Sequence, residues 1–128
     1  MKLLLDTHAF LWWVADDPQL SATAKNMIAN SNNTIYFSVA SAWEIIIKVG
    51  TGKLVLPENP EIYIPSRLIS NQLETLPIFI SHVLKINSLA NFHKDPFDRL
   101  LIAQSLVENI PIITIDRLIT QYPVKIIW

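Results

Sequence analysis

Apolar strand-like segments alternate with helix-like segments along the whole chain, and this alternation restricts the fold more than any other feature. Strands are predicted over residues 2–5, 34–37, 74–76, 111–115 and 124–128. Helices are predicted over residues 7–15, 21–29, 38–50, 61–71, 81–90 and 96–107. Such alternation is typical of a parallel sheet covered by helices on both faces. The sequence therefore predicts an α/β protein, a three-layer α/β/α sandwich with a central parallel sheet, formed as one domain by residues 1–128.

Individual residues indicate where the helices begin and end. Ser21, Ser38 and Ser81 each precede a helical pattern and are expected to cap it. Asp95–Pro96 is a stronger start signal, because Pro favours the first helical position and Asp the cap before it. Gly50 is expected to end the helix that follows Ser38.

Composition narrows the class of protein. The chain has no Cys, which excludes disulfides and thiolate metal sites. No run approaches the ~18 apolar residues of a membrane-spanning helix, and Asp6 interrupts the first apolar segment too early for a signal peptide. A cytoplasmic protein without a membrane partner is expected. Because 51% of the residues are hydrophobic and only 16% are charged, part of the surface is expected to lie in a dimer or partner complex.

Four acids stand where an α/β fold gathers functional groups. Asp6 and Asp116 each follow an apolar strand, Asp98 lies in the first turn of a helix, and Glu44 lies on the helix after another strand. Ligands of parallel sheets bind at the carboxyl ends of the strands. Several carboxylates without Cys or His form a hard oxygen site of the type that suits Mg²⁺ or Mn²⁺. The four acids are therefore predicted to form one metal site.

Each of these acids also has a structural interpretation. Asp95 and Asp98 both suit a helix start, and capping is the favoured role for Asp95. Glu44 is one turn from Lys48 and suits a surface ion pair with it. The two acids at the strand ends suit turns or caps. Their joint occurrence at these positions is what favours the metal site.

The charge of the chain permits a nucleic-acid partner without requiring one. The formal net charge is -1, with 11 acids against 10 Lys and Arg. Setting aside the four predicted ligands and Asp95 leaves six acids, so the remaining surface is mildly basic. Trp12 and Trp13 are candidates for stacking on RNA bases, with one of them expected in the core and the other at an interface. His8 and His93 lie near the predicted site in the sequence and are expected to form structural hydrogen bonds.

Four segments, taken in order, resemble the PIN-domain family, and in particular its VapC-like toxins of prokaryotic toxin–antitoxin pairs. They are Leu4–Thr7, Ser41–Ile45, Asp95–Gln104 and Ile113–Asp116, with Lys53–Leu54 matching after the second. The resemblance implies a sheet of order 3-2-1-4-5, in which the strands that precede Asp6 and Asp116 are neighbours. One departure is that Arg117–Leu118 follows Asp116, where the family usually has a second polar residue.

The resemblance also implies a function. Asp6, Glu44, Asp98 and Asp116 would be the catalytic metal ligands, and Asp95 would support them without contacting the ion. The activity would be Mg²⁺- or Mn²⁺-dependent endoribonuclease cleavage of single-stranded RNA. Water would attack the phosphodiester in line and leave a 5′-phosphate and a 3′-hydroxyl. The protein would form a homodimer and be silenced by a cognate antitoxin lying in an apolar groove.

Three further residues are predicted to contact the substrate: Thr7, Lys48 and Arg99. For Arg99 an ion pair with Asp95 is an equal alternative to a phosphate contact. A catalytically silent PIN module that binds RNA or protein is the alternative function, but the full set of acids disfavours it. An aspartyl-phosphate phosphatase is disfavoured because His8 stands two residues after Asp6, where that chemistry requires a second Asp. A receiver domain is disfavoured because its paired acids and its late Lys are both missing.

Overall fold

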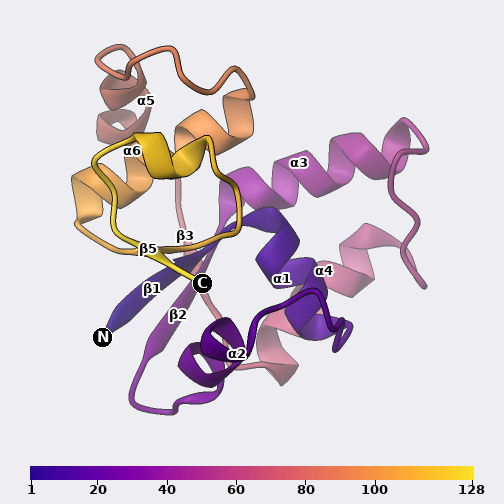
Figure 1. Cartoon of the computed structure of the whole chain (residues 1–128). Coiled ribbons are helices and arrows are strands. Elements are labelled where there is room, and N and C mark those ends of the chain that lie inside the picture. The colour runs from indigo at the N-terminus through magenta and orange to yellow at the C-terminus, as the bar shows by residue number, and fades with distance from the viewer.

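The computed structural model describes all 128 residues and contains one five-stranded parallel sheet (Figure 1). The strands are β1 (Lys2–Leu5), β2 (Thr34–Ser38), β3 (Glu74–Leu76), β4 (Ile112–Ile113) and β5 (Ile126–Ile127). Their order in the sheet is β3-β2-β1-β4-β5, and every neighbouring pair is parallel. The predicted α/β/α sandwich and the strand order 3-2-1-4-5 are confirmed.

Six α-helices and one short 3-10 helix connect the strands. They are α1 (Thr7–Val14), α2 (Ala22–Ala29), α3 (Val39–Gly50), α4 (Pro60–Ser70), α5 (Ile80–Ile86), α6 (Pro96–Glu108) and the 3-10 helix η1 (Ile119–Gln121). Figure 1 shows α1, α2 and α4 on one side of the sheet, and α5, α6 and η1 on the other. None of these helices is both long enough and apolar enough to cross a membrane.

The sheet separates two hydrophobic cores, and the central strand contributes to both. Leu3 and Leu5 point into the core beneath α1, α2 and α4, whereas Leu4 points into the core beneath α6. Phe10 and Phe37 stack in the first core with their ring centroids 4.3 Å apart. Because both faces of β1 are covered, its sequence is continuously apolar rather than alternating.

Most predicted helix ends are confirmed, and the start of α5 is the exception. Ser21, Ser38 and Asp95 each accept a backbone N–H and cap α2, α3 and α6. The predicted helix 81–90 with Ser81 as its cap is wrong, because the helix starts at Ile80 and already ends at Ile86. The helix is capped at Phe79, two residues before the serine. The backbone N–H of Phe79 donates to Nδ1 of the His82 ring at 3.0 Å.

The last two strands are shorter than predicted. β4 comprises Ile112–Ile113 rather than 111–115, and β5 comprises Ile126–Ile127 rather than 124–128. β4 ends where the Thr114 hydroxyl turns to Asp6 and also accepts the N–H of Asp116. Side-chain hydrogen bonds thus replace the ladder at the point where the chain leaves the sheet.

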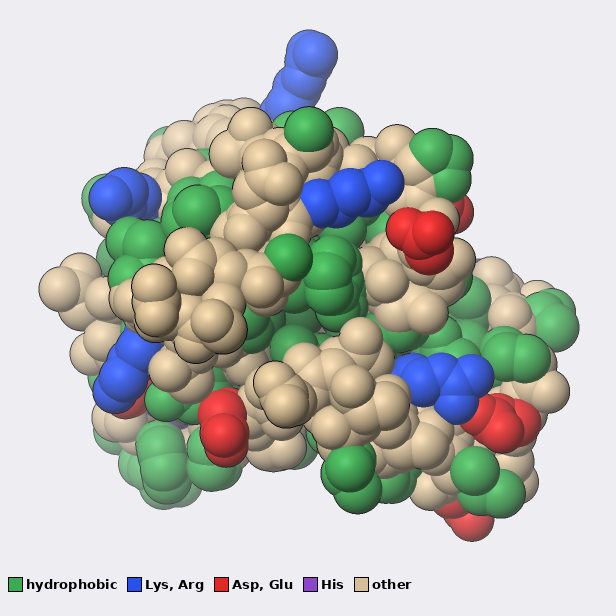
Figure 2. All heavy atoms as spheres, turned by 90° about the horizontal axis from the view of Figure 1, so that it is seen from below, with side chains coloured by type: hydrophobic (Ala, Val, Ile, Leu, Met, Phe, Trp, Pro, Cys, Tyr) green, Lys and Arg blue, Asp and Glu red, His purple; other side chains and the backbone are tan.

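Strand register brings several polar residues to one edge of the sheet. Leu5 of β1 pairs with Phe37 of β2 and with Ile113 of β4. Asp6 follows Leu5, and Thr114 follows its partner Ile113. These two residues therefore lie side by side where the chain leaves the sheet. Figure 2 shows a different face, seen from below, where single Lys, Arg, Asp and Glu side chains are scattered among apolar ones. Acidic side chains are instead concentrated at the carboxyl ends of the strands.

Candidate active site

Asp6 is the most buried acid of this edge apart from Glu44, with 5% of its surface exposed. Its Oδ1 atom accepts the N–H of Ala9 at 2.7 Å and so caps α1. Its Oδ2 atom accepts the hydroxyl of Thr114, across the β1–β4 pair. Burial raises the pKa of Asp6 above its ordinary value, and these two hydrogen bonds act in the opposite direction.

Asp116 likewise uses one oxygen for the backbone and presents the other to the site. Its Oδ1 atom accepts the N–H of Leu118 at 2.8 Å, which closes a turn. Its Oδ2 atom lies 2.8 Å from Nε2 of His93. Thr114 connects this residue to Asp6, because its oxygen also accepts the N–H of Asp116 at 3.0 Å.

Asp98 lies in the first turn of α6 but does not cap the helix. Asp95 does so, because its Oδ1 accepts the N–H groups of Phe97 and Asp98 at 2.9 and 3.0 Å. The carboxylate of Asp98 is therefore free to face the site. Burial, together with the negative charges of Asp95 and Glu44, raises its pKa to about 7, and His93 opposes the shift.

Glu44 projects into the site from the second turn of α3, with only 3% of its surface exposed. Its Oε1 atom accepts the hydroxyl of Thr7 at 2.6 Å, and Ser41 Oγ lies 2.9 Å from that hydroxyl. Its Oε2 atom lies 2.6 Å from Nζ of Lys48, one turn along the helix. The ion pair with Lys48 expected from the spacing is present, and it is anchored at a buried carboxylate rather than at an open surface.

His93 forms structural hydrogen bonds, as expected, but the sequence did not indicate which groups of the site it contacts. Its Nδ1 atom accepts the N–H of Asp95 at 3.2 Å, so the ring proton is on Nε2. That Nε2 atom lies 2.8 Å from Asp116 and 3.2 Å from Asp98, and it therefore bridges the two carboxylates. The spacing of His93 before Asp95 and Asp98 was visible in the sequence, but only the fold shows that it faces Asp116.

Arg99 fixes the loop that carries His93. The predicted ion pair between Arg99 and Asp95 is not formed. The guanidinium donates instead to the carbonyls of Ile86, Ala90 and His93 and lies 3.4 Å from the Tyr122 hydroxyl. That hydroxyl also accepts the N–H of His93 at 2.9 Å. Arg99 thus positions the imidazole from the far side of the loop, and a phosphate contact by Arg99 stays a prediction.

The sequence pattern of the PIN domain matches residues 3–125, which is nearly the whole chain. The chain belongs to the PIN-domain family. Ribonuclease VapC16 from Mycobacterium tuberculosis (strain ATCC 25618 / H37Rv) is 38% identical over 69 residues, which cover 51% of this chain. The match spans 48% of that relative, about half of its length.

Solved structures share the same PIN fold. VapBC2 from Rickettsia felis, bound to a DNA fragment from its promoter, aligns with a TM-score of 0.72 at 18% identity, covering 98% of this chain and 97% of that one. DNA-bound VapBC from Salmonella typhimurium aligns with a TM-score of 0.70 at 18% identity, and VapBC-1 from nontypeable Haemophilus influenzae aligns with a TM-score of 0.67 at 20% identity. Each alignment covers 98% of this chain and 96% of the chain in the solved structure. These likenesses establish the fold.

The donor groups of this PIN chain suit a hard divalent cation. One carboxylate oxygen from Asp98, one from Asp116 and a ring nitrogen of His93 all lie within 4.8 Å of one another; the two carboxylates are the predicted cation ligands, and the His93 N–H holds them together. Asp6 and Glu44, the other two predicted ligands, lie beside this group and interact electrostatically with its carboxylates. Asp116 raises the pKa of Asp6, and Glu44 raises the pKa of Asp98. Carboxylates that repel one another in this way would be stabilised by a cation between them.

The raised pKa of Asp98 predicts a pH-dependent stability. From its ordinary pKa of 3.8 up to about 7, the folded metal-free chain retains a proton that the unfolded chain has lost. The free energy of unfolding therefore falls as the pH rises through this interval. Asp98→Asn removes this effect, so its melting temperature relative to the wild type should rise by roughly 4 °C or more between pH 5 and pH 8 in chelator. The exposed Asp16→Asn is the control, and parallel curves for wild type and Asp98→Asn would contradict the prediction.

Proposed function

We propose that this chain is a divalent-metal-dependent endoribonuclease that cleaves single-stranded RNA. The observation that carries the proposal is the convergence of four carboxylates at one edge of a PIN-domain sheet: Asp6 and Glu44 are buried there, and Asp98 and Asp116 are half-buried. A curated relative bears the name ribonuclease, and its similarity covers about half of this chain. Hydrolysis of a phosphodiester is a reaction that such a donor set supports.

Asp98 and Asp116 would hold Mg²⁺ or Mn²⁺ directly, with Asp6 and Glu44 completing the ligand set. A bound ion of this type lowers the pKa of water and neutralises charge that develops on the reacting phosphate. Thr114 and the N–H of Ala9 hold the Asp6 carboxylate in place, and Thr7 holds that of Glu44. Asp95 adds negative charge near Asp98 while its own oxygen caps α6.

Two of the residues predicted to contact the substrate border the site. Lys48 and Thr7 both bind Glu44; the Lys48 side chain is partly exposed, whereas Thr7 is buried. The Lys48 ammonium is the positive group nearest to the carboxylates on this side, and we propose that it neutralises a substrate phosphate there. Since RNA is the substrate, the cytoplasm is the expected compartment.

A partner protein and a second copy of the chain are also proposed. Two helices expose apolar stripes: Val39, Trp43, Ile46 and Ile47 on α3, and Ile80, Val83 and Leu84 on α5. Stripes of this kind are typical of interfaces. The three solved relatives are VapBC assemblies, and we propose that this chain is likewise a toxin controlled by a cognate antitoxin, and that the stripes on α3 and α5 form its homodimer.

RNA cleavage tests the enzyme directly. End-labelled RNAs should be cut in Mg²⁺ or Mn²⁺ but not in chelator, and the products should carry 5′-phosphates. Asp98→Asn and Asp116→Asn should each lower the rate at least ~100-fold, because loss of a ligand should exceed the loss of an outer partner. Asp16→Asn should cut normally. Failure of the wild type both to cleave and to bind Mn²⁺ would favour the silent PIN module.

The bridge at His93 predicts a role in metal affinity. His93→Ala removes the N–H that holds Asp98 and Asp116 together, and should weaken Mn²⁺ binding by about 10–100-fold in titration calorimetry. His93→Gln keeps an N–H donor and should recover part of the affinity. Thermal melts establish that both variants are folded. Unchanged Mn²⁺ affinity in His93→Ala would show that the imidazole is structural only.

The apolar stripes predict a dimer in solution. Light scattering at micromolar concentration should give twice the mass of one chain. Ile47→Asp on α3 and Leu84→Asp on α5 should each produce monomers, because a carboxylate would be buried without a partner. Ile69→Asp is the matched control, since Ile69 is 80% exposed on α4, outside both stripes. A wild-type monomer would contradict the prediction.

A further inference from the structure

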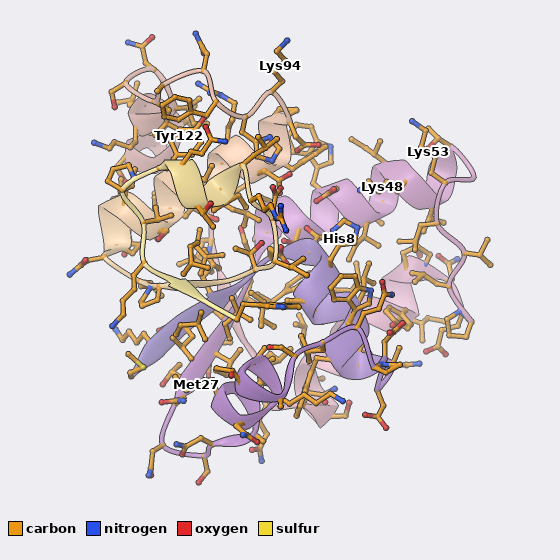
Figure 3. All side chains as sticks on the ribbon, viewed as in Figure 1. His8, Met27, Lys48, Lys53, Lys94 and Tyr122 are labelled. Atoms are coloured by element: carbon orange, nitrogen blue, oxygen red, sulfur yellow. The ribbon has the colours of Figure 1, made fainter.

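A groove of about 600 Å³ opens beside the carboxylates, between α1, the end of α3 and the segment that follows it. Thr7 and Lys48 line this groove, and both also bind Glu44. The groove is therefore continuous with the candidate active site. Figure 3 shows His8, Lys48 and Lys53 on this side of the molecule, where α1 and α3 lie together, whereas Lys94 extends outward from the loop before α6.

One wall of the groove is aromatic and held in place. Trp12 packs edge-on against Trp128, with ring centroids 6.0 Å apart. The ring centroid of His8 lies 5.6 Å from that of Trp12, and the two rings are tilted by 41°. Leu11 and Leu54 supply apolar neighbours in the same lining. The Trp12 indole is thus a fixed, half-buried surface on which a flat ring can stack.

The rim of the groove has a charge opposite to that of the site beside it. Lys48 and Lys53 stand along it, with Asp17 as the single acid in the lining. A phosphate group is attracted to this rim and repelled by the carboxylates. Among candidate occupants, a nucleotide supplies both an anionic group for the lysines and a flat apolar ring for Trp12. An apolar protein segment would match the wall but supply no anionic group for Lys53.

We propose that this groove binds the nucleotide next to the scissile phosphate of single-stranded RNA, with its base on Trp12 and its phosphate at Lys53. The proposal rests on the function proposed above, because it takes the carboxylate cluster as the point of cleavage. Base stacking and backbone charge are common to all nucleotides, so the groove selects single strands rather than a particular sequence.

Binding of a fluorescein-labelled oligouridylate of eight nucleotides to the full chain, followed by anisotropy in chelator, tests this subsite without requiring cleavage. Trp12→Ala should weaken binding by about 5- to 100-fold, the range for loss of one base stack. Trp12→Phe retains a stacking surface and should stay within about threefold of wild type. Lys53→Gln should lower the slope of log K against log salt by about 0.7, as expected for one phosphate contact.

Two variants serve as matched controls. Phe79→Ala truncates a half-exposed aromatic ring at the residue that precedes α5, and Lys125→Gln removes a charge near the opposite edge of the sheet. Neither should alter the affinity or the salt slope. Thermal melts identify any loss of folding in Trp12→Ala, and Trp12→Phe and Lys53→Gln test the proposal independently of it.

The possible outcomes distinguish a failure of the proposed subsite from a failure of the proposed nuclease activity. Equal affinities and salt slopes for wild type, Trp12→Ala and Lys53→Gln would overturn the proposal and leave the groove to a partner protein. If RNA is cleaved while these variants still bind normally, the nuclease stands and the subsite fails. If binding depends on Trp12 and Lys53 but no RNA is cleaved with Mg²⁺ or Mn²⁺, the subsite stands and the proposed reaction fails.

Discussion

The site depends on the pairing of β1 with a parallel strand on each side. In this register Leu5 is the neighbour of both Phe37 and Ile113. The carboxyl ends of β2, β1 and β4 therefore lie next to one another at the same edge of the sheet. Asp6 follows directly, α3 begins after β2, and Thr114 follows β4. A slip of one residue would turn every side chain of a strand to the other face. The two cores on either side of β1 exclude such a slip, because Leu3 and Leu5 belong to one core and Leu4 to the other.

Burying acids and concentrating them at this edge carries an electrostatic cost: burial is the main cause of the raised pKa values of Asp6 and Asp98, and neighbouring carboxylates add to it. Neighbouring groups offset part of it without removing the charge. The hydroxyls of Thr7 and Thr114 and the N–H of His93 each donate to a carboxylate, and Lys48 adds a full positive charge at Glu44. The compensation is weakest at Asp98, whose carboxylate has only the His93 ring nearby. Affinity for a cation should therefore be centred on Asp98.

Local sequence predicted the strands and most helix ends, because these depend on patterns within a few residues. The convergence of the strand-end acids followed from the strand order that the family resemblance implies. The start of α5 was missed because the helix is capped at Phe79, whose backbone N–H donates to the His82 ring, and not at Ser81. The contacts of His93 and Arg99 were missed for a different reason. His93 meets Asp116 across 23 residues, and Arg99 meets Tyr122 across the same separation, so no local pattern indicates either contact.

In the sequence, helix capping and metal binding are alternative interpretations of the acids. In the folded chain the two roles are compatible. A carboxylate has two oxygens, and Asp6 and Asp116 each give Oδ1 to a backbone N–H and direct Oδ2 toward the neighbouring strand or loop. The backbone contact restricts the rotation of the side chain and so orients the second oxygen in advance. Asp95 and Asp98 divide the same two tasks between two residues, because Asp95 caps α6 and leaves Asp98 free to face the site. Capping is thus the means by which this fold aims its carboxylates.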